Sequence, residues 1–428
     1  QFSEDAGPLA HPVRPRAYKE INNFYTPTVY EKGAEAIRML KALIGPKAFA
    51  AGMDLYFRRC DGTAATIEDF LACFSETSGQ NLGHFARWYE QAGTPHLVAS
   101  GRYDAGDRRY TLDLAQSTPP TPGQPTKEPL VIPIAFGLVG RAGDLDWSTA
   151  EGPVEGNVIR LTSHSTSVIF HDVAERPTPS LLRGFSAPVR FDIDLSDEEL
   201  ITLFRSDSDP FNRWQSLQTV ALRALVRATH AVRNGEEPSF PSALTEAFAS
   251  FLERDALADP AFAAQVFSLP GESDVAREIG RDIDPDAILA ARKALRRGLG
   301  RSLEAALERL HAKLAGSAPY SPDAASAGRR ALLNEALSLL IAGGSDRGLA
   351  LAEAQMASAD NLTARFGALG ALCQIASPVR AAALEAFGKR YAQEPLVLDK
   401  WFALQASIPE AETIDRVEAL MAHPAFDL

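Results

Sequence analysis

One tyrosine of this chain lies where its hydroxyl group could take part in catalysis. Tyr30 stands at the start of an apolar-faced helical pattern in the segment Asn23–Leu40. Phenols remain protonated at neutral pH, so they can donate a hydrogen bond to an oxygen that gains negative charge during amide hydrolysis. Periodicity alone favours another interpretation, in which Tyr30 is a core residue with a satisfied hydroxyl. Taken by themselves, the residues leave both roles open.

The histidines do not have the spacing that a catalytic zinc site requires. The motif His-Glu-x-x-His, which supplies two ligands and a general base from one helix, does not occur in the sequence. No two of the eight histidines lie four residues apart: His11, His84, His96, His164, His171, His230, His311 and His423. Each is better interpreted as a surface or structural histidine. We therefore expect this chain to bind no zinc and no other cofactor by itself.

Composition indicates a cytoplasmic protein of several globular domains. With 428 residues, of which 46% are hydrophobic, the chain is long enough to form two or three separate cores. Its net charge of −12 disfavours nucleic acid and anionic membranes as partners. There is no apolar run of the ~20 residues that span a bilayer, and the first residues do not resemble a secretory signal. Cys60, Cys73 and Cys373 lack metal-site spacing and an adjacent base, so we expect them to be reduced and packed as small apolar residues.

Hydrophobic periodicity changes twice along the chain. Helical patterns occupy residues 1–95, including an apolar stripe of Tyr30, Ala34, Ile37 and Ile44 and a helix that begins at Thr66. A period of two follows over 96–195, where strands are expected at 110–114, 130–139, 158–161, 167–170 and 189–193. Ala/Leu-rich helices fill 196–428, beginning with a capping box at Ser196. This order predicts a multidomain α+β fold: a helical part, a small antiparallel β-sandwich and an all-α superhelical domain, or α-solenoid.

Several local features of the helical parts also carry expectations. Five dipeptides place a capping side chain before a proline at the start of a helix: Asp209-Pro210, Asp259-Pro260, Asp284-Pro285, Ser321-Pro322 and Ser377-Pro378. The arginines Arg292, Arg296 and Arg297 are typical of a solvated helix face. Gly33, which is costly inside a helix, suggests the close approach of another element.

The segment Tyr30-Glu31-Lys32-Gly33-Ala34 resembles the tyrosine segment of bacterial aminopeptidase N (alanyl aminopeptidase), a family of gluzincin zinc metallopeptidases. The resemblance continues in family order through 11–15, 58–66, 88–95 and 400–406. It implies that the first helical part is the end of a thermolysin-like catalytic domain. It also implies that the Tyr30 hydroxyl stabilises the tetrahedral oxyanion, and that Glu31 contacts the bound substrate. Glu31 otherwise aligns with Glu35 and Arg38 for a helix-surface ion pair, and Tyr25 supports the preceding loop.

Two functions remain open at this stage. In the first, the chain is a fragment of a zinc-dependent aminopeptidase, running from after the zinc-binding motif to within the C-terminal helical domain. The zinc, the peptide substrates and the N-terminal domains of the same polypeptide are then its partners, and the fragment should be inactive alone. In the second, the chain is a non-enzymatic scaffold, in which a β-sandwich and an α-solenoid bind peptides or proteins. Truncation at the catalytic domain would leave Tyr30 and Ala34 exposed to solvent, whereas a self-contained scaffold would bury them.

Overall fold

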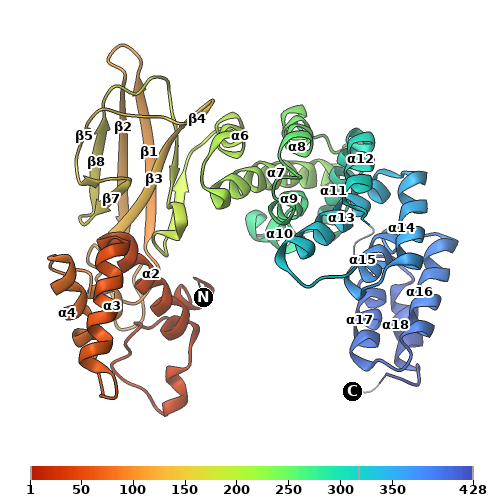
Figure 1. The fold of residues 1–428 in the computed structure, drawn as a ribbon, viewed down its shortest axis with the longest axis horizontal. Helices are drawn as coiled ribbons and strands as arrows, with labels where there is room; N and C mark the ends of the chain where they lie inside the picture. Colours follow the sequence, from red (N-terminus) through yellow and green to blue (C-terminus); the bar gives the residue numbers. More distant parts are fainter. Residues whose placement is uncertain (1, 317–318, 427–428) are drawn as a thin grey trace. The chain divides into compact units, whose positions relative to one another are not determined.

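The computed structural model describes residues 2–316 and 319–426, whose contacts form two compact units, Gln1–Ser216 and Leu217–Leu428 (Figure 1). In the first unit, short helices precede a β-sandwich of two sheets. The second unit is built from helices. The predicted multidomain α+β fold is therefore confirmed, while the domain limits at 95 and 195 stay a prediction. None of the helices in the described ranges is long and apolar enough to cross a membrane.

The first helical part packs around a small aromatic core. Its elements are α1 (Phe2–Asp5), α2 (Gly33–Ile44), α3 (Pro46–Cys60), α4 (Ile67–Ser78) and α5 (Arg87–Glu90). The expected start at Thr66 is confirmed, because its side chain accepts a hydrogen bond from the Asp69 backbone amide in a capping box. Met39, Phe74 and Trp88 are fully buried, and the Trp88 indole donates a 2.8 Å hydrogen bond to the Val131 carbonyl of the sandwich. The helices and the sandwich therefore share one hydrophobic core.

The sandwich contains strands that the period-two pattern predicted and others that it missed. One sheet has the order β10-β1-β2-β8-β5 and the other β4-β3-β7-β6, with β9 paired to β3. Their bounds are β1 (His96–Asp104), β2 (Arg109–Ser117), β3 (Ile132–Gly140), β4 (Gly143–Asp144), β5 (Ala150–Glu151), β6 (Val154–Glu155), β7 (Val158–Leu161), β8 (Ser165–Phe170), β9 (Thr178–Leu181) and β10 (Arg190–Ile193). The named pairs are antiparallel except β1 with β10, which run parallel because the chain returns beside its own first strand.

The strands β1 and β9 were not predicted because their sequences lack a clear strand pattern. Half of β1 is small or charged, and its later residues are exposed, so hydrophobic alternation is weak there. In β9, Pro179 cannot donate a ladder hydrogen bond, which argues against a strand when the sequence is considered alone. Pro179 is tolerated because β9 pairs with β3 alone and so lies at a sheet edge. Pairing with β3, and not the local propensity of residues 178–181, therefore makes β9 a strand.

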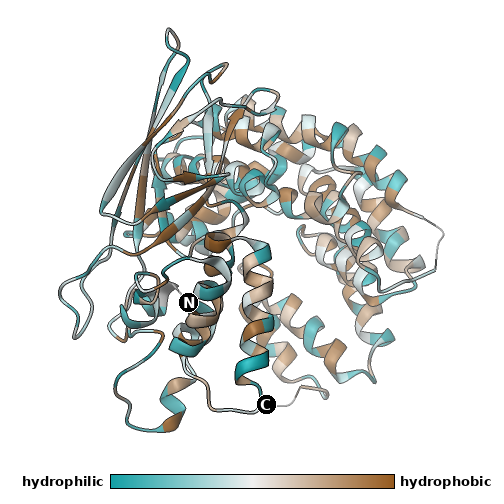
Figure 2. Ribbon diagram, turned by 60° about the vertical axis from the view of Figure 1, so that its left-hand side comes forward, coloured by the Kyte–Doolittle hydropathy of each residue, from teal (hydrophilic) through white to brown (hydrophobic). Residues whose placement is uncertain are grey.

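After Ser196 the described residues form helices and no strand. These helices are α6 (Asp197–Ser206), α7 (Pro210–Arg233), α8 (Ser242–Arg254), α9 (Pro260–Phe267), α10 (Glu272–Ile279), α11 (Pro285–Ser302), α12 (Glu304–Leu314), α13 (Ala324–Gly343), α14 (Asp346–Ser358), α15 (Leu362–Leu372), α16 (Pro378–Arg390), α17 (Pro395–Ala406) and α18 (Thr413–Met421). Many of them carry hydrophilic and hydrophobic residues around the same axis, as amphipathic helices do (Figure 2). The capping box at Ser196 is present, with Glu199 as its partner.

Four of the five proline-linked helix starts are correct, and one is wrong. Asp209, Asp259, Asp284 and Ser377 each accept a hydrogen bond from a backbone amide of the helix that follows. The exception is Ser321, because α13 begins at Ala324 and is capped by Asp323. The Ser321 hydroxyl instead donates a 2.5 Å hydrogen bond to the Asp323 carboxylate. Ser321 therefore orients the Asp323 side chain but does not itself cap α13.

The cysteines are free, as the sequence analysis expected. Cys73 and Cys373 are buried, whereas Cys60 is partly exposed. Burial raises the pKa of the Cys373 thiol to about 11, so that thiol is protonated at neutral pH.

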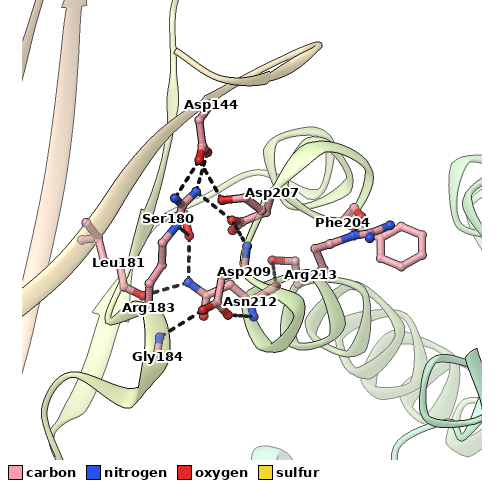
Figure 3. Close-up of polar contacts among 12 residues, drawn as sticks. Asp144, Ser180, Leu181, Arg183, Gly184, Phe204, Asp207, Asp209, Asn212 and Arg213 are labelled. Atoms are coloured by element: carbon pink, nitrogen blue, oxygen red, sulfur yellow. Dashed lines mark hydrogen bonds and ion pairs between the residues drawn. The ribbon is translucent and has the colours of Figure 1, made fainter. Parts of the chain in front are cut away.

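An arginine at the end of the sandwich joins it to the helices that follow within the first unit. Arg183 donates two hydrogen bonds to the Asp144 carboxylate, at 2.9 and 2.6 Å, and a third to Asp207 at 2.7 Å (Figure 3). Asp144 belongs to β4 and Asp207 follows α6, so one guanidinium connects two elements distant in sequence. The Asp207 side chain is fully buried, and burial raises the pKa of its carboxyl group. Arg183 therefore supplies the positive charge that this buried carboxylate requires.

The guanidinium of Arg183 lies directly against the backbone of β3. A Cβ atom at Gly137 would approach Arg183 Cζ to 2.1 Å, far inside van der Waals contact. A side chain at position 137 would therefore require the Arg183 guanidinium to shift from its present position beside the carboxylates. Asn212 of α7 completes the cluster by donating to Ser180 Oγ and to the Leu181 carbonyl (Figure 3).

We expect Arg183→Met to destabilise the first unit by about 3 kcal/mol, because it leaves the Asp207 carboxylate buried without a counter-ion. The measurement is urea denaturation followed by tryptophan fluorescence. Arg102→Met is the matched control, since it breaks the exposed ion pair with Asp113 and should cost about 0–1 kcal/mol. Equal midpoints for the two variants would show that the Arg183 cluster contributes no more than a surface pair.

Candidate active-site segment

Tyr30 lies in a π-helical turn, Thr28–Lys32, that leads directly into α2. Thr28 and Lys32 are buried, whereas Tyr30, halfway between them, is 58% exposed. Residues two positions apart in a helix lie on roughly opposite sides of its axis. Because Thr28 and Lys32 both face the core, Tyr30 between them faces outward. Turns of this type are rare and are common at functional sites. The expectation that Tyr30 is exposed in this chain is therefore confirmed.

The Tyr30 hydroxyl has no hydrogen bond to any other described residue, and the ring contacts one neighbour. Tyr25 stacks on Tyr30 with ring centroids 6.0 Å apart and planes 22° apart. The Tyr25 ring is 66% exposed, so it lies beside the tyrosine on the same open face. From the sequence, Tyr25 was expected to support the loop, and its stacking on Tyr30 was not expected.

A buried ion pair holds the π-helical turn in place. Lys32 Nζ donates to Asp5 Oδ2 at 2.8 Å and to the Gly93 carbonyl at 3.0 Å. The second oxygen of Asp5 accepts from the Gly93 amide, and Thr94 Oγ1 donates to Asp5 Oδ2 at 2.7 Å. Both charged side chains are 2% exposed. Burial lowers the pKa of Lys32, while Asp5 acts to raise it, so the pair is stable only as a unit.

A second set of hydrogen bonds fixes the loop that precedes Tyr30. The Val29 amide donates to Thr26 Oγ1 at 3.2 Å, and Thr26 Oγ1 lies 3.0 Å from His11 Nε2. His11 Nδ1 lies 2.8 Å from the Pro12 carbonyl, which can only accept, so Nδ1 carries the proton. His11 Nε2 then accepts from the Thr26 hydroxyl. His11 is therefore a structural histidine, as expected, and it is bonded to the segment that carries Tyr30.

Three finer expectations about this segment are wrong. Glu31 is exposed and forms no ion pair with a described residue; Glu35 and Arg38 pair with each other instead, at 3.3 Å. At Gly33, a Cβ atom would meet Val13 Cγ1 at an ordinary 3.5 Å, so no close approach requires glycine there. Ile44 does not share the exposed face of Tyr30, Ala34 and Ile37, because it packs on the core. The π-helical turn explains the wrong alignments of Glu31 and Ile44, because it shifts the residues before Gly33 relative to α2.

The described residues do not fit a metal site. Their His, Cys, Asp and Glu side chains form no group of three that could hold a metal ion. His96 and His171 lie in the sandwich and bond to the nearby carboxylates Asp192 and Glu151. Zinc chemistry cannot therefore be assigned to these side chains. What the segment offers is a fixed, outward-facing hydrogen-bond donor.

Comparison with protein families divides the chain into three consecutive matches. Residues 1–89 match the peptidase family M1 domain. Residues 93–194 match a domain of unknown function with an Ig-like fold (DUF3458), and residues 197–428 match its partner domain with ARM repeats (DUF3458_C). Tyr30 and both anchors of its turn lie within the M1 match.

Curated relatives agree over the whole chain. Aminopeptidase N of Caulobacter vibrioides is 45% identical over 428 residues, which are 100% of this chain and 48% of the relative. Aminopeptidase N of Escherichia coli is 37% identical over the same span, covering 49% of the relative. The chain belongs to the DUF3458_C family, whose model matches more than half of it, and it is similar over its whole length to these two aminopeptidase N proteins. It spans about half the length of these curated relatives.

A solved aminopeptidase structure has the same fold. Legionella pneumophila aminopeptidase A, crystallised in complex with aspartic acid, superposes with a TM-score of 0.79 at 25% sequence identity. The match covers 97% of this chain and 47% of the Legionella protein. The order of helical part, Ig-like sandwich and helical repeats thus agrees with a solved structure.

We expect Asp5→Asn to lower the stability of the first unit by about 3 kcal/mol, because Lys32 would keep a buried charge without a carboxylate. Urea denaturation measures the change. The double variant Asp5→Asn/Lys32→Met should recover part of the loss, since it removes the stranded charge. Glu35→Gln, which breaks the exposed pair with Arg38, is the control and should cost about 0–1 kcal/mol. If the double variant is less stable than Asp5→Asn, charge burial is not the cause.

Proposed function

We propose that this chain is part of a zinc-dependent aminopeptidase that releases N-terminal amino acids from peptides. The observation that carries the proposal is the exposure of Tyr30 on a turn anchored from both sides, inside the M1 match. Relatives named aminopeptidase N that match the whole chain support the same activity. Because the described residues do not fit a metal site, zinc would be held by other parts of the complete protein.

In this proposal Tyr30 stabilises the tetrahedral oxyanion. Attack on a peptide carbonyl moves negative charge onto its oxygen, and a donor already aimed at that position lowers the barrier. The Tyr30 hydroxyl is suited to this because it has no described partner to release first. Its backbone is fixed as well, since the Tyr30 amide donates to the Thr26 carbonyl at 3.1 Å. Lys32 and Asp5 are positioning residues, because they act on the turn without contacting substrate.

Glu31 is the proposed substrate-binding residue. Its carboxylate is next to Tyr30, exposed, and not neutralised by any described cation. A free carboxylate beside an oxyanion donor can attract a positively charged group of the bound peptide. The remaining partners in this proposal are the N-terminal domains of the same polypeptide, with neither nucleic acid nor membrane taking part.

The alternative is the non-enzymatic scaffold that binds peptides or proteins on its sandwich and helical repeats. A self-contained scaffold would bury the Tyr30 face, whereas Tyr30, Ala34 and Ile37 are all exposed. That exposure favours the enzyme, because a catalytic domain has a use for an open donor.

In the complete protein, we expect Tyr30→Phe to lower kcat and kcat/KM alike by about 100-fold, since the hydroxyl contributes mainly in the transition state. Hydrolysis of an aminoacyl p-nitroanilide measures both constants. Tyr25→Phe, on the same face and in contact with the same ring, is the matched control and should stay within about twofold of the parent. A Tyr30→Phe enzyme that keeps half of its activity would assign the tyrosine to packing.

The 428-residue chain alone should bind no stoichiometric zinc and hydrolyse no aminoacyl amide. The reason is the absence of paired ligands among its histidines and of a metal-binding group in its described part. Metal analysis of the purified chain by mass spectrometry, after dialysis against zinc, tests this. One tightly held zinc per chain would contradict it.

A further inference from the structure

A hollow of about 570 Å³ opens within the second unit, in a size range typical of small-molecule sites. Residues of α11 and the ends of α13, α15 and α17 line it. These helices are neighbours, since α11 packs on α13 and α13 on α15 (Figure 1). A Cβ atom at Gly300 of α11 would meet the Leu339 carbonyl of α13 at 2.1 Å, so glycine lets the two backbones touch. The wall of the hollow is thus held by a tight helix contact.

The hollow is basic in an acidic protein. Four cationic side chains of α11 line it: Arg292, Lys293, Arg296 and Arg297. Their spacing places two pairs four residues apart, on one face of the helix. The whole of α11 carries five basic residues and one acidic residue, whereas the chain has a net charge of −12. This concentration of positive charge is not explained by the peptidase chemistry proposed above.

The acidic residues at the rim are already engaged. Glu272 pairs with Arg292 at 3.0 Å, and Arg292 also donates to the Pro270 carbonyl. Glu410 receives two hydrogen bonds from Arg380, at 2.6 and 2.9 Å, and lies 3.4 Å from Arg416. Neither carboxylate is therefore left to neutralise the remaining three cations of the hollow.

Arg296 is not on a solvated face, contrary to the sequence expectation. It is partly buried and donates to Ser338 Oγ at 2.6 Å, and its contact with Gln374 Oε1 is 3.4 Å. Burial lowers the pKa of Arg296, and the nearby Glu335 acts to raise it, although burial also raises the pKa of Glu335. The two described hydrogen-bond partners of Arg296 are neutral, so an anion in the hollow would stabilise its charged form.

Lys293 and Arg297 are exposed and form no hydrogen bond or ion pair with another described residue. They lie four residues apart and line the same space as Arg296. The lining also includes four apolar side chains, Leu289 of α11 itself and Ile375, Leu404 and Ile408 from later in the chain. A ligand here would meet both free cations and hydrocarbon in the same space.

We propose that this hollow binds a small organic anion whose carboxylates bond to Lys293, Arg296 and Arg297. Arginine forks match carboxylates in geometry, and charge-assisted hydrogen bonds are the strong ones. The apolar side chains of the lining favour a ligand with a carbon skeleton, because an inorganic anion would contact the cations alone. The lining residues belong to the second unit and Tyr30 to the first, and the proposal does not depend on the aminopeptidase activity.

The test is calorimetric titration of the complete protein with glutarate, and separately with inorganic phosphate, at chloride-matched ionic strength. We expect saturable binding of glutarate, tighter than that of phosphate. Lys293→Gln/Arg297→Gln should weaken glutarate binding by about tenfold or more, because each lost charged hydrogen bond is worth about that factor. Both side chains are exposed and unpartnered within the described residues, so the variant should fold.

The matched control is Lys313→Gln/Lys400→Gln, which removes the same charge from exposed sites outside the lining. It should leave glutarate binding unchanged. An equal loss in the control would reduce the effect to overall charge and overturn the proposal. Absence of saturable glutarate binding would also overturn it, as would phosphate binding as tight as that of glutarate.

Discussion

The buried pair of Lys32 and Asp5 is the interaction on which the first unit depends. It joins three segments that are distant in sequence: the first helix, the turn that carries Tyr30, and the strand-leading loop at Gly93 and Thr94. An isolated lysine in such a position would be driven out by desolvation, and so would an isolated aspartate. Each charge is tolerated because the other is present, so the three segments can be buried only together.

This arrangement explains how an exposed tyrosine can also be well positioned. The side chain of Tyr30 faces solvent and contributes little to the core, so packing cannot hold it. Its neighbours two residues away on either side are buried instead, and the loop before it is bonded through Thr26 and His11. The rigidity of the donor is therefore supplied by residues that never contact it. Arg183 follows the same principle in joining the sandwich to α6 and α7.

Much of the fold could be predicted because it follows from period and capping. The helical part, the sandwich and the helical repeats appear in the predicted order, and Thr66 and Ser196 begin helices where their side chains reach the third amide. The failures arise where tertiary contacts decide. Pro179 lies in a strand because β3 offers an edge, and Asp323 caps α13 although Ser321-Pro322 has the better local signature. A single sequence does not encode these choices locally.

The candidate site was less accessible to sequence reasoning. Tyr30 could be singled out through its motif, and its catalytic role stays a prediction, as does that of Glu31. Nothing in the pattern indicated that Lys32 is buried, since lysine is almost never buried without a partner and Asp5 is far away in sequence. The π-helical turn was equally hidden, because helical periodicity alone does not distinguish one wide turn from a regular helix.

The wide turn at Thr28–Lys32 also bears on how this segment can change during evolution. Deleting one residue there would convert the wide i→i+5 turn to a regular α-helix, in which the rotation per residue is different. Lys32 and Tyr30 could then not both keep their directions, although every remaining side chain would be unaltered. A change in the length of this segment therefore alters several side-chain directions at once, whereas a substitution alters one side chain. The length of the segment is thus a stricter constraint than the identity of most of its residues.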